Sequence, residues 1–246
     1  MNAIEIKQLR KEYKDRVAVD DLTFNIKEGE FFALLGFNGA GKTTTIKMLT
    51  GLLKPTSGDA LVFGKSIITD MNSIKEYINI SPQETAIAPN LTVFENLVFI
   101  AEIYGFKKEI AKTKANLLLE QFKLTDRKND KSKKLSGGLK RRLSIAMSLI
   151  TNPKIIFLDE PTLGLDVRSR RELWHILNEL KGNVTVILTT HYLDEVEALS
   201  DSIAIIDKGN LKAIGSLDEL KKQSGLEKLE DIFLTLIESE EVLWRH

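Results

Sequence analysis

A glycine-rich segment of this chain has the residue types that hold a chain of phosphates. Residues 36–43 read GFNGAGKT and fit the pattern G-x-x-x-x-G-K-[ST]. Glycines allow a tight turn in which successive N–H groups point at phosphate oxygens. We expect Lys42 to reach the β- and γ-phosphates and Thr43 to be a ligand of Mg²⁺. The alternative is a chance glycine-rich turn, but the strand-like run before the segment and the helix-like stretch after it favour a phosphate loop.

Polar residues also follow two other apolar runs. Asp159 and Glu160 follow the run 155–158, and His191 comes shortly after the run 184–188. Ligands bind α/β sheets at the carboxyl ends of the strands, so we expect these side chains beside the phosphate loop. There Asp159 would hold Mg²⁺ through its water shell, and Glu160 would orient the attacking water or accept its proton. His191 would contact the γ-phosphate. The alternatives are an acidic pair that caps the next helix and a histidine with a structural role. We interpret His175 and His246 as structural or solvated residues.

A second helix start has the features of an anion-binding site. Ser136, Gly137 and Gly138 precede a helix-like run over 141–150, and the N-terminus of a helix attracts anions. One nucleotide has little use for two such sites in one subunit. Two subunits in head-to-tail contact would let each one offer this second site to the nucleotide of the other. The alternative is a flexible loop before a helix.

The elements that position these residues can be predicted from the apolar pattern. Alternating apolar residues at 4–6 and 22–26 indicate strands of an antiparallel sheet with one wet face. The continuous apolar runs 31–35, 155–158 and 184–188 indicate strands that are covered on both faces. A helix between the last two runs implies a parallel sheet.

The rest of the chain divides into a helical segment and a C-terminal part. Residues 90–150 contain no candidate strand, and Thr92 and Glu95 have the spacing of a capping box, which predicts an inserted helical lobe. A hairpin over 203–214 and a second capping pair, Ser216 and Glu219, lead into C-terminal helices.

Composition excludes several classes of protein. The chain has 246 residues, 35 Lys plus Arg, 35 Asp plus Glu and no Cys. The absence of a basic surplus argues against nucleic-acid binding, and the absence of Cys excludes disulfides and thiolate metal sites. We find no signal peptide and no run of about 20 apolar residues. We therefore expect a cytoplasmic chain that needs a partner for any role in transport.

Six motifs taken in order resemble those of one family. The segments GFNGAGKT, SPQE, LSGG, IIFLDEP, GLD and TTH are similar to those of the nucleotide-binding subunit of ATP-binding-cassette (ABC) transporters, over about residues 3–215. The resemblance implies an α/β fold: a P-loop NTPase core with a RecA-like parallel sheet, an N-terminal antiparallel β subdomain and an inserted α-helical lobe. The expected single domain, 1–246, divides into a core (1–87 and 151–215), a signature lobe (88–150) and a C-terminal helical tail (216–246).

The resemblance also implies roles at matching positions, with ATP and Mg²⁺ as cofactors. Tyr13 matches an aromatic residue that stacks on adenine, although it fits an ordinary strand residue as well, and Gln83 matches a glutamine that senses Mg²⁺ and water. Ser136 and Gly138 match the signature that contacts the γ-phosphate across a dimer, and Asp166 matches a loop that links the two sites. The other expected nucleotide contacts are Asn38, Gly39, Ala40, Gly41, Lys42, Thr43 and Thr44. The expected metal ligands are Thr43, Gln83 and Asp159, and the expected catalytic residues are Glu160, His191, Gln83 and Lys42.

Departures from the family pattern narrow the prediction. Phe37 replaces the usual Pro without an expected loss, Leu139 replaces Gln, and Leu163-Gly164 replaces Ser-Ala. These changes and the tail segment 229–234 resemble the exporter branch that pairs with a separate permease. We therefore expect a homodimer or paired cassettes in the ATP-bound state, held by a permease at the inner face of the membrane.

Two other functions were weighed. A soluble ABC-type switch acting on ribosomes or in DNA repair would usually carry two cassettes, long coiled-coil insertions or basic extensions, and this sequence has none. A GTPase would need an N-K-x-D motif, which is absent, and a small-molecule kinase would have no use for LSGG.

Overall fold

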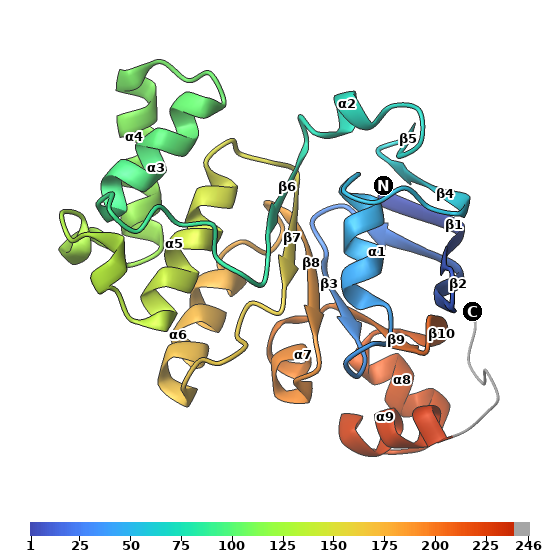
Figure 1. Ribbon diagram of the computed structural model, residues 1–246. Helices are drawn as coiled ribbons and strands as arrows, with labels where there is room; N and C mark the ends of the chain where they lie inside the picture. Colours follow the sequence, from blue (N-terminus) through green and yellow to red (C-terminus); the bar gives the residue numbers. More distant parts are fainter. Residues whose placement is uncertain (239–246) are drawn as a thin grey trace.

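Two β-sheets share a hydrophobic core in the computed structural model, which describes residues 1–238 (Figure 1). The first sheet has the order β2-β1-β4-β5, with every neighbouring pair antiparallel. Its strands are β1 (Asn2–Tyr13), β2 (Arg16–Lys27), β4 (Ser57–Val62) and β5 (Lys65–Ser66). The alternation of the N-terminal residues is confirmed, since Ile4 and Ile6 are buried and Lys7 is exposed.

The second sheet carries the polar strand ends identified in the sequence. Its order is β10-β9-β3-β8-β7-β6, and among the described strands all neighbouring pairs but β9 and β10 are parallel. The strands are β3 (Phe31–Leu35), β6 (Ile78–Ser81), β7 (Ile155–Asp159), β8 (Thr185–Thr190), β9 (Ser202–Asp207) and β10 (Asn210–Gly215). We did not predict β6, because it is only four residues long and half of these are polar.

Both faces of the parallel sheet are covered, as its continuous apolar runs predict. Phe32 packs in the core shared with the antiparallel sheet and with helix α1 (Lys42–Leu49), and its ring stacks on Phe24 with a centroid distance of 5.4 Å. Phe31, its neighbour in β3, points to the other face and packs in the core formed with the helical lobe. Successive residues of β3 therefore pack in two different hydrophobic cores, one on each face of the parallel sheet.

The helical lobe projects from the parallel sheet beside β6 (Figure 1). Its helices are α3 (Val93–Ile103), α4 (Lys108–Gln121), η1 (Thr125–Arg127), η2 (Ser132–Lys134) and α5 (Gly137–Leu149), and the other helices are α2 (Met71–Ile74), α6 (Val167–Asn178), α7 (Leu193–Leu199), α8 (Leu217–Ser224) and α9 (Leu229–Glu238). The predicted capping boxes at Thr92 and Ser216 are both present.

The C-terminal helices α8 and α9 pack on one face of the parallel sheet, over β3, β9 and β10. Buried residues of α8 and α9 share a core with Leu35 of β3. Phe233 of α9 also meets Phe37 of the glycine-rich loop edge-on, with ring centroids 5.1 Å apart. His246 and the acidic residues at 240 and 241 lie outside the described residues. Within 1–238, no helix combines the length and the apolar character needed to cross a membrane.

Candidate active site

The glycine-rich loop joins β3 to α1 and has a backbone that only glycine allows. Gly41 has a φ of 107°, and a Cβ added there would lie 2.5 Å from the carbonyl oxygen of Ala18. The loop borders a cavity of about 420 Å³ at the carboxyl ends of the parallel strands. The residues that line it are Arg16, Ala18, Asn38, Gly39, Gly41, Lys42, Thr43, Thr44, Gln83, Glu160, Leu163 and His191. Ala40, also expected to contact the nucleotide, is buried in the loop beneath.

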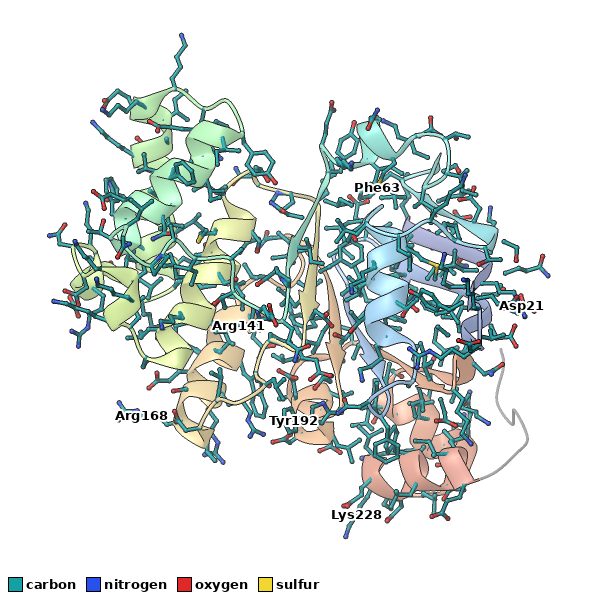
Figure 2. The ribbon with its side chains drawn as sticks, in the orientation of Figure 1. Asp21, Phe63, Arg141, Arg168, Tyr192 and Lys228 are labelled. Carbon is teal, nitrogen blue, oxygen red and sulfur yellow. The ribbon has the colours of Figure 1, made fainter. Side chains whose placement is uncertain are left out.

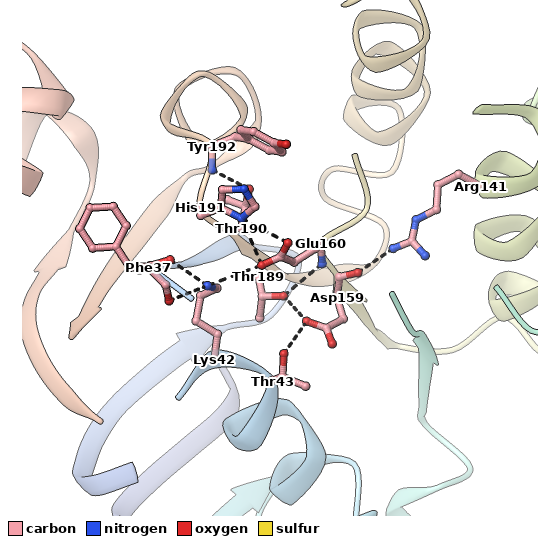
Figure 3. Close-up of polar contacts among 11 residues, drawn as sticks. Phe37, Lys42, Thr43, Arg141, Asp159, Glu160, Thr189, Thr190, His191 and Tyr192 are labelled. Atoms are coloured by element: carbon pink, nitrogen blue, oxygen red, sulfur yellow. Dashed lines mark hydrogen bonds and ion pairs between the residues drawn. The ribbon is translucent and has the colours of Figure 1, made fainter. Parts of the chain in front are cut away.

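The Lys42 ammonium lies at the centre of the polar contacts in this cavity. Its Nζ donates to the carbonyl oxygens of Gly36, at 2.7 Å, and Phe37, at 3.2 Å, and lies 3.6 Å from Glu160 Oε1 (Figure 3). Burial lowers the pKa of Lys42, and the carboxylate of Glu160 opposes that shift. The loop therefore holds a desolvated cation where a phosphate chain would gain most from it.

Asp159, at the end of β7, is tied to the start of α1. The hydroxyls of Thr43 and Thr189 donate to Asp159 Oδ1 at 3.1 and 2.5 Å. One carboxylate and one adjacent hydroxyl are oxygen donors of the kind that Mg²⁺ takes when it keeps several waters. The residues present therefore fit a magnesium site at Thr43 and Asp159.

Glu160 faces Lys42 on one side and a histidine on the other. His191 Nδ1 lies 3.2 Å from the carboxylate of Glu160, whose side chain is only 10% exposed. The next helix, α6, is capped by Asp166 and not by the acidic pair. Glu160 has a φ of 45°, a region that residues with a Cβ rarely occupy. This carboxylate is held between the Lys42 ammonium and the His191 imidazole and can accept a proton from a water molecule next to it.

Three of the sequence-predicted residues lie together away from this cavity. Ser136 caps α5, and Asp166 caps α6 by accepting from the N–H of Ser169 at 2.9 Å. Gly138 packs against the same Ser169, so a Cβ added there would lie 3.0 Å from its side chain. The sequence predicted a helix start at Ser136, and the structure places it against the start of α6.

Two further expected residues, Gln83 and Tyr13, lie at or near the border of the cavity. Gln83 follows β6 and lines the cavity on the side of the lobe. Tyr13, which is 41% exposed, does not line the cavity, but it pairs across the β1–β2 hairpin with Arg16, which does. His175 is exposed and lies 3.6 Å from Glu179, in agreement with a solvated residue.

Sequence reasoning missed several residues at this site. Arg16 and Leu163 line the cavity, and Thr189 and Arg141 bond to Asp159. Thr189 stands inside the quoted TTH segment, but only its pairing with β7 brings it to a carboxylate. Nothing local in the sequence distinguishes Arg141 from the arginine that follows it.

The comparisons with known proteins agree with this geometry. The family model described as ABC transporter matches residues 19–163. The daunorubicin/doxorubicin resistance ATP-binding protein DrrA of Streptomyces peucetius is 42% identical over 91% of this chain and 68% of its own. The linearmycin resistance ATP-binding protein LnrL of Bacillus subtilis is 41% identical over 90% of this chain and 72% of its own. The phospholipid-transporting ATPase ABCA3 of Rattus norvegicus is 44% identical over 90% of this chain, which spans only 13% of that protein.

Solved structures show the same architecture. An ATP-binding subunit of an ABC transporter has a TM-score of 0.83 at 31% identity, covering 95% of this chain and 99% of its own. A dimeric ATP-binding cassette bound to ADP and Pi, in a post-hydrolysis state, has a TM-score of 0.78 at 27% identity, covering 87% of this chain and 98% of its own. Fold, site and relatives together show that the chain belongs to the ABC transporter family and is an ATP-binding cassette of the ABC ATPase type.

Proposed function

We propose that this cassette hydrolyses MgATP between two copies of the chain and thereby powers export through a separate membrane permease. The observation that carries the proposal is that the two helix starts expected to bind anions do not line the same cavity. The Lys42 loop lines the cavity with Glu160 and His191, whereas Ser136 and Gly138 line no part of it. A second copy in head-to-tail contact would bring its Ser136 helix start to the nucleotide held by the first.

The residues around the cavity have distinct tasks in this mechanism. Lys42 exchanges its carbonyl acceptors for the β- and γ-phosphates. Glu160 then orients the attacking water and accepts its proton, while His191 holds the Glu160 carboxylate and contacts the γ-phosphate. Thr43, Gln83 and, through the water shell of the ion, Asp159 would hold Mg²⁺, which would neutralise charge on the phosphates.

The permease would dock on the helical lobe near Gln83. Phe99 and Ile103 of α3 and Tyr104, its C-cap, are 49%, 62% and 53% exposed, a concentration of large apolar side chains at one end of the helix. Beside Tyr104 and Ile100 lies a cavity of about 130 Å³ that reaches Pro82, the residue before Gln83. Docking there would place the complex at the inner face of the membrane. The relatives named for drug resistance support export as the direction of transport.

Replacement of the proposed catalytic carboxylate tests the mechanism. Glu160→Gln should bind MgATP as the wild type does, lose hydrolysis and accumulate a dimer, because closure no longer ends in phosphate release. Nucleotide binding, phosphate release and size-exclusion chromatography with light scattering measure the three effects. A strictly monomeric Glu160→Gln protein at saturating MgATP, or one with near-normal hydrolysis, would contradict the proposal.

A further inference from the structure

Arg141, in α5, lies at the junction of the helical lobe and the parallel sheet (Figure 2). Its side chain is buried, and its guanidinium donates to three main-chain carbonyl oxygens. Nε bonds to Pro161 and Nη2 to Asp159, each at 2.9 Å, and Nη1 bonds to Pro82. One side chain therefore joins the ends of β6 and β7 to the helix that begins at Ser136.

Two of these carbonyl groups stand on either side of Glu160. Asp159 precedes it and Pro161 follows it, and Glu160 itself has the left-handed φ of 45°. Such a conformation persists only where the surroundings determine it. The N–H of Glu160 donates to the Thr189 carbonyl at 3.1 Å, and Arg141 holds the two flanking carbonyls. This backbone directs the Glu160 carboxylate to Lys42 and His191 (Figure 3).

The chemistry of the contact requires arginine. A buried cation is costly unless its donors are satisfied, and here the partners are carbonyls on three separate segments. The planar fork of a guanidinium reaches these acceptors from three different nitrogen atoms, whereas the ammonium of lysine would have to donate to all of them from one nitrogen. Burial lowers the pKa of Arg141 to about 10, opposed by Asp159 and Glu195, so the side chain stays protonated at neutral pH.

We propose that Arg141 is a positioning residue that holds the backbone of Glu160 in its hydrolytic conformation. Through its bond to Pro82 and its place in α5, Arg141 also couples this conformation to the segment that carries Gln83 and to the helix that Ser136 caps. A movement of α5 relative to the sheet would pull on the carbonyls beside Glu160 and before Gln83. The inference rests on the proposed function, because it gives Arg141 a task only if Glu160 acts on water.

The test compares two neighbouring arginines on the same helix. Arg141→Lys should lower kcat at least about tenfold and change the Kd for MgATP less than about threefold, because the Lys42 loop is untouched. Arg142→Lys is the matched control: Arg142 is equally buried but pairs with Glu172 of α6, and lysine can keep that pair. Its kcat should stay within about twofold of the wild type. Circular dichroism and thermal melting check the fold of each variant.

A double-mutant comparison separates positioning from general stability. If Arg141 acts through Glu160, adding Arg141→Lys to Glu160→Gln should leave the residual single-turnover rate unchanged, since the effects are not additive. If Arg141→Lys does not fold, Arg141→Gln, which keeps an N–H donor, is measured in its place.

Different results overturn different claims. Wild-type kcat in both the Lys and the Gln variants, a Kd that rises in parallel with the loss of kcat, or a fully additive double mutant would each overturn the role of Arg141 and leave the proposed function standing. Near-normal hydrolysis by Glu160→Gln alone would instead overturn the proposed function.

Discussion

Lys42 and Glu160 show how closely the charges of the site are balanced. The Lys42 ammonium has two loop carbonyls and one carboxylate as partners. An incoming phosphate chain brings negative charge to the same ammonium and would release Glu160 to face water. In the proposed mechanism, phosphate binding would therefore also free the Glu160 carboxylate to act on water.

Removal of the Lys42 cation should abolish most nucleotide binding. Lys42→Ala should raise the Kd for MgATP at least about tenfold, because a desolvated charge on the phosphates is lost. Isothermal titration calorimetry measures the change. Lys47→Ala, an exposed lysine of the same helix, is the control and should bind normally; equal affinities of the two variants would exclude Lys42 from the phosphate site.

Glu195 provides a pH-dependent prediction. Burial raises the pKa of Glu195, whose carboxylate accepts from the Trp174 indole at 3.3 Å. Because the pKa of Glu195 is raised in the folded state, this residue contributes its full stabilisation below the unfolded-state pKa, near 4.5. That stabilisation is lost as the pH rises through the folded-state pKa. Glu195→Gln keeps the acceptor but cannot ionise, so its stability relative to the wild type should increase with pH above 4.5. Urea unfolding across the pH range measures this, and parallel curves would contradict it.

The phosphate loop could be predicted from the sequence because its chemistry is local. The glycines, the lysine and the threonine all lie within eight consecutive positions, and the glycines themselves indicate a tight turn of the backbone. Arg141 and Arg16 could not be predicted, since their contacts join segments that only the fold brings together. Nothing in the sequence indicates which of two adjacent arginines points to the sheet.

Among the elements, α5 and α6 form a pair whose starts fit closely. Gly138 approaches Ser169, the residue that donates to the cap Asp166. The absence of a side chain at Gly138 therefore allows α5 to approach α6 closely. Both caps have a local sequence signal, but the contact between them has none.

A methyl group at this contact should destabilise the fold. Gly138→Ala should lower the free energy of unfolding by about 1–3 kcal/mol, because the added Cβ overpacks against Ser169. Gly137→Ala is the control: no neighbouring atom lies within 4 Å of its added Cβ, and alanine favours the helix. Chemical denaturation measures both, and equal effects would show that the contact is not tight.

Elements with strong signals were predicted, and short ones were not. The capping boxes at Thr92 and Ser216 and the three continuous apolar strands β3, β7 and β8 are confirmed. Strand β6 was missed, although it borders β7 and leads to Gln83. Its strand character comes from pairing with β7 and from its cover by α5, which a four-residue pattern cannot reveal.

At the scale of the whole molecule, the C-terminal helix reaches the phosphate loop. Phe233 of α9 is 3% exposed and contacts Phe37. We expected Phe37 to be a neutral departure from the family pattern, and the structure gives it a packing partner. Helix α9 therefore supports the glycine-rich loop.

Loss of this support should affect the stability of the whole protein. Phe233→Ala should cost about 3–5 kcal/mol through the cavity that it leaves, whereas Leu234→Ala, at a position 41% exposed, should be nearly neutral. Thermal unfolding measures both, with and without MgATP. A small loss at Phe233 would mean that α9 packs only loosely.

The position of β3 in its sheet has a consequence for biosynthesis. This strand is made well before its two neighbours, β8 and β9, whose residues begin at 185 and 202. Until the ribosome has released these segments, both edges of an apolar strand stay open, and open edges recruit other chains. Truncated chains that end before residue 185 should therefore aggregate or depend on chaperones, even though they already contain the complete glycine-rich loop and the acidic pair Asp159-Glu160.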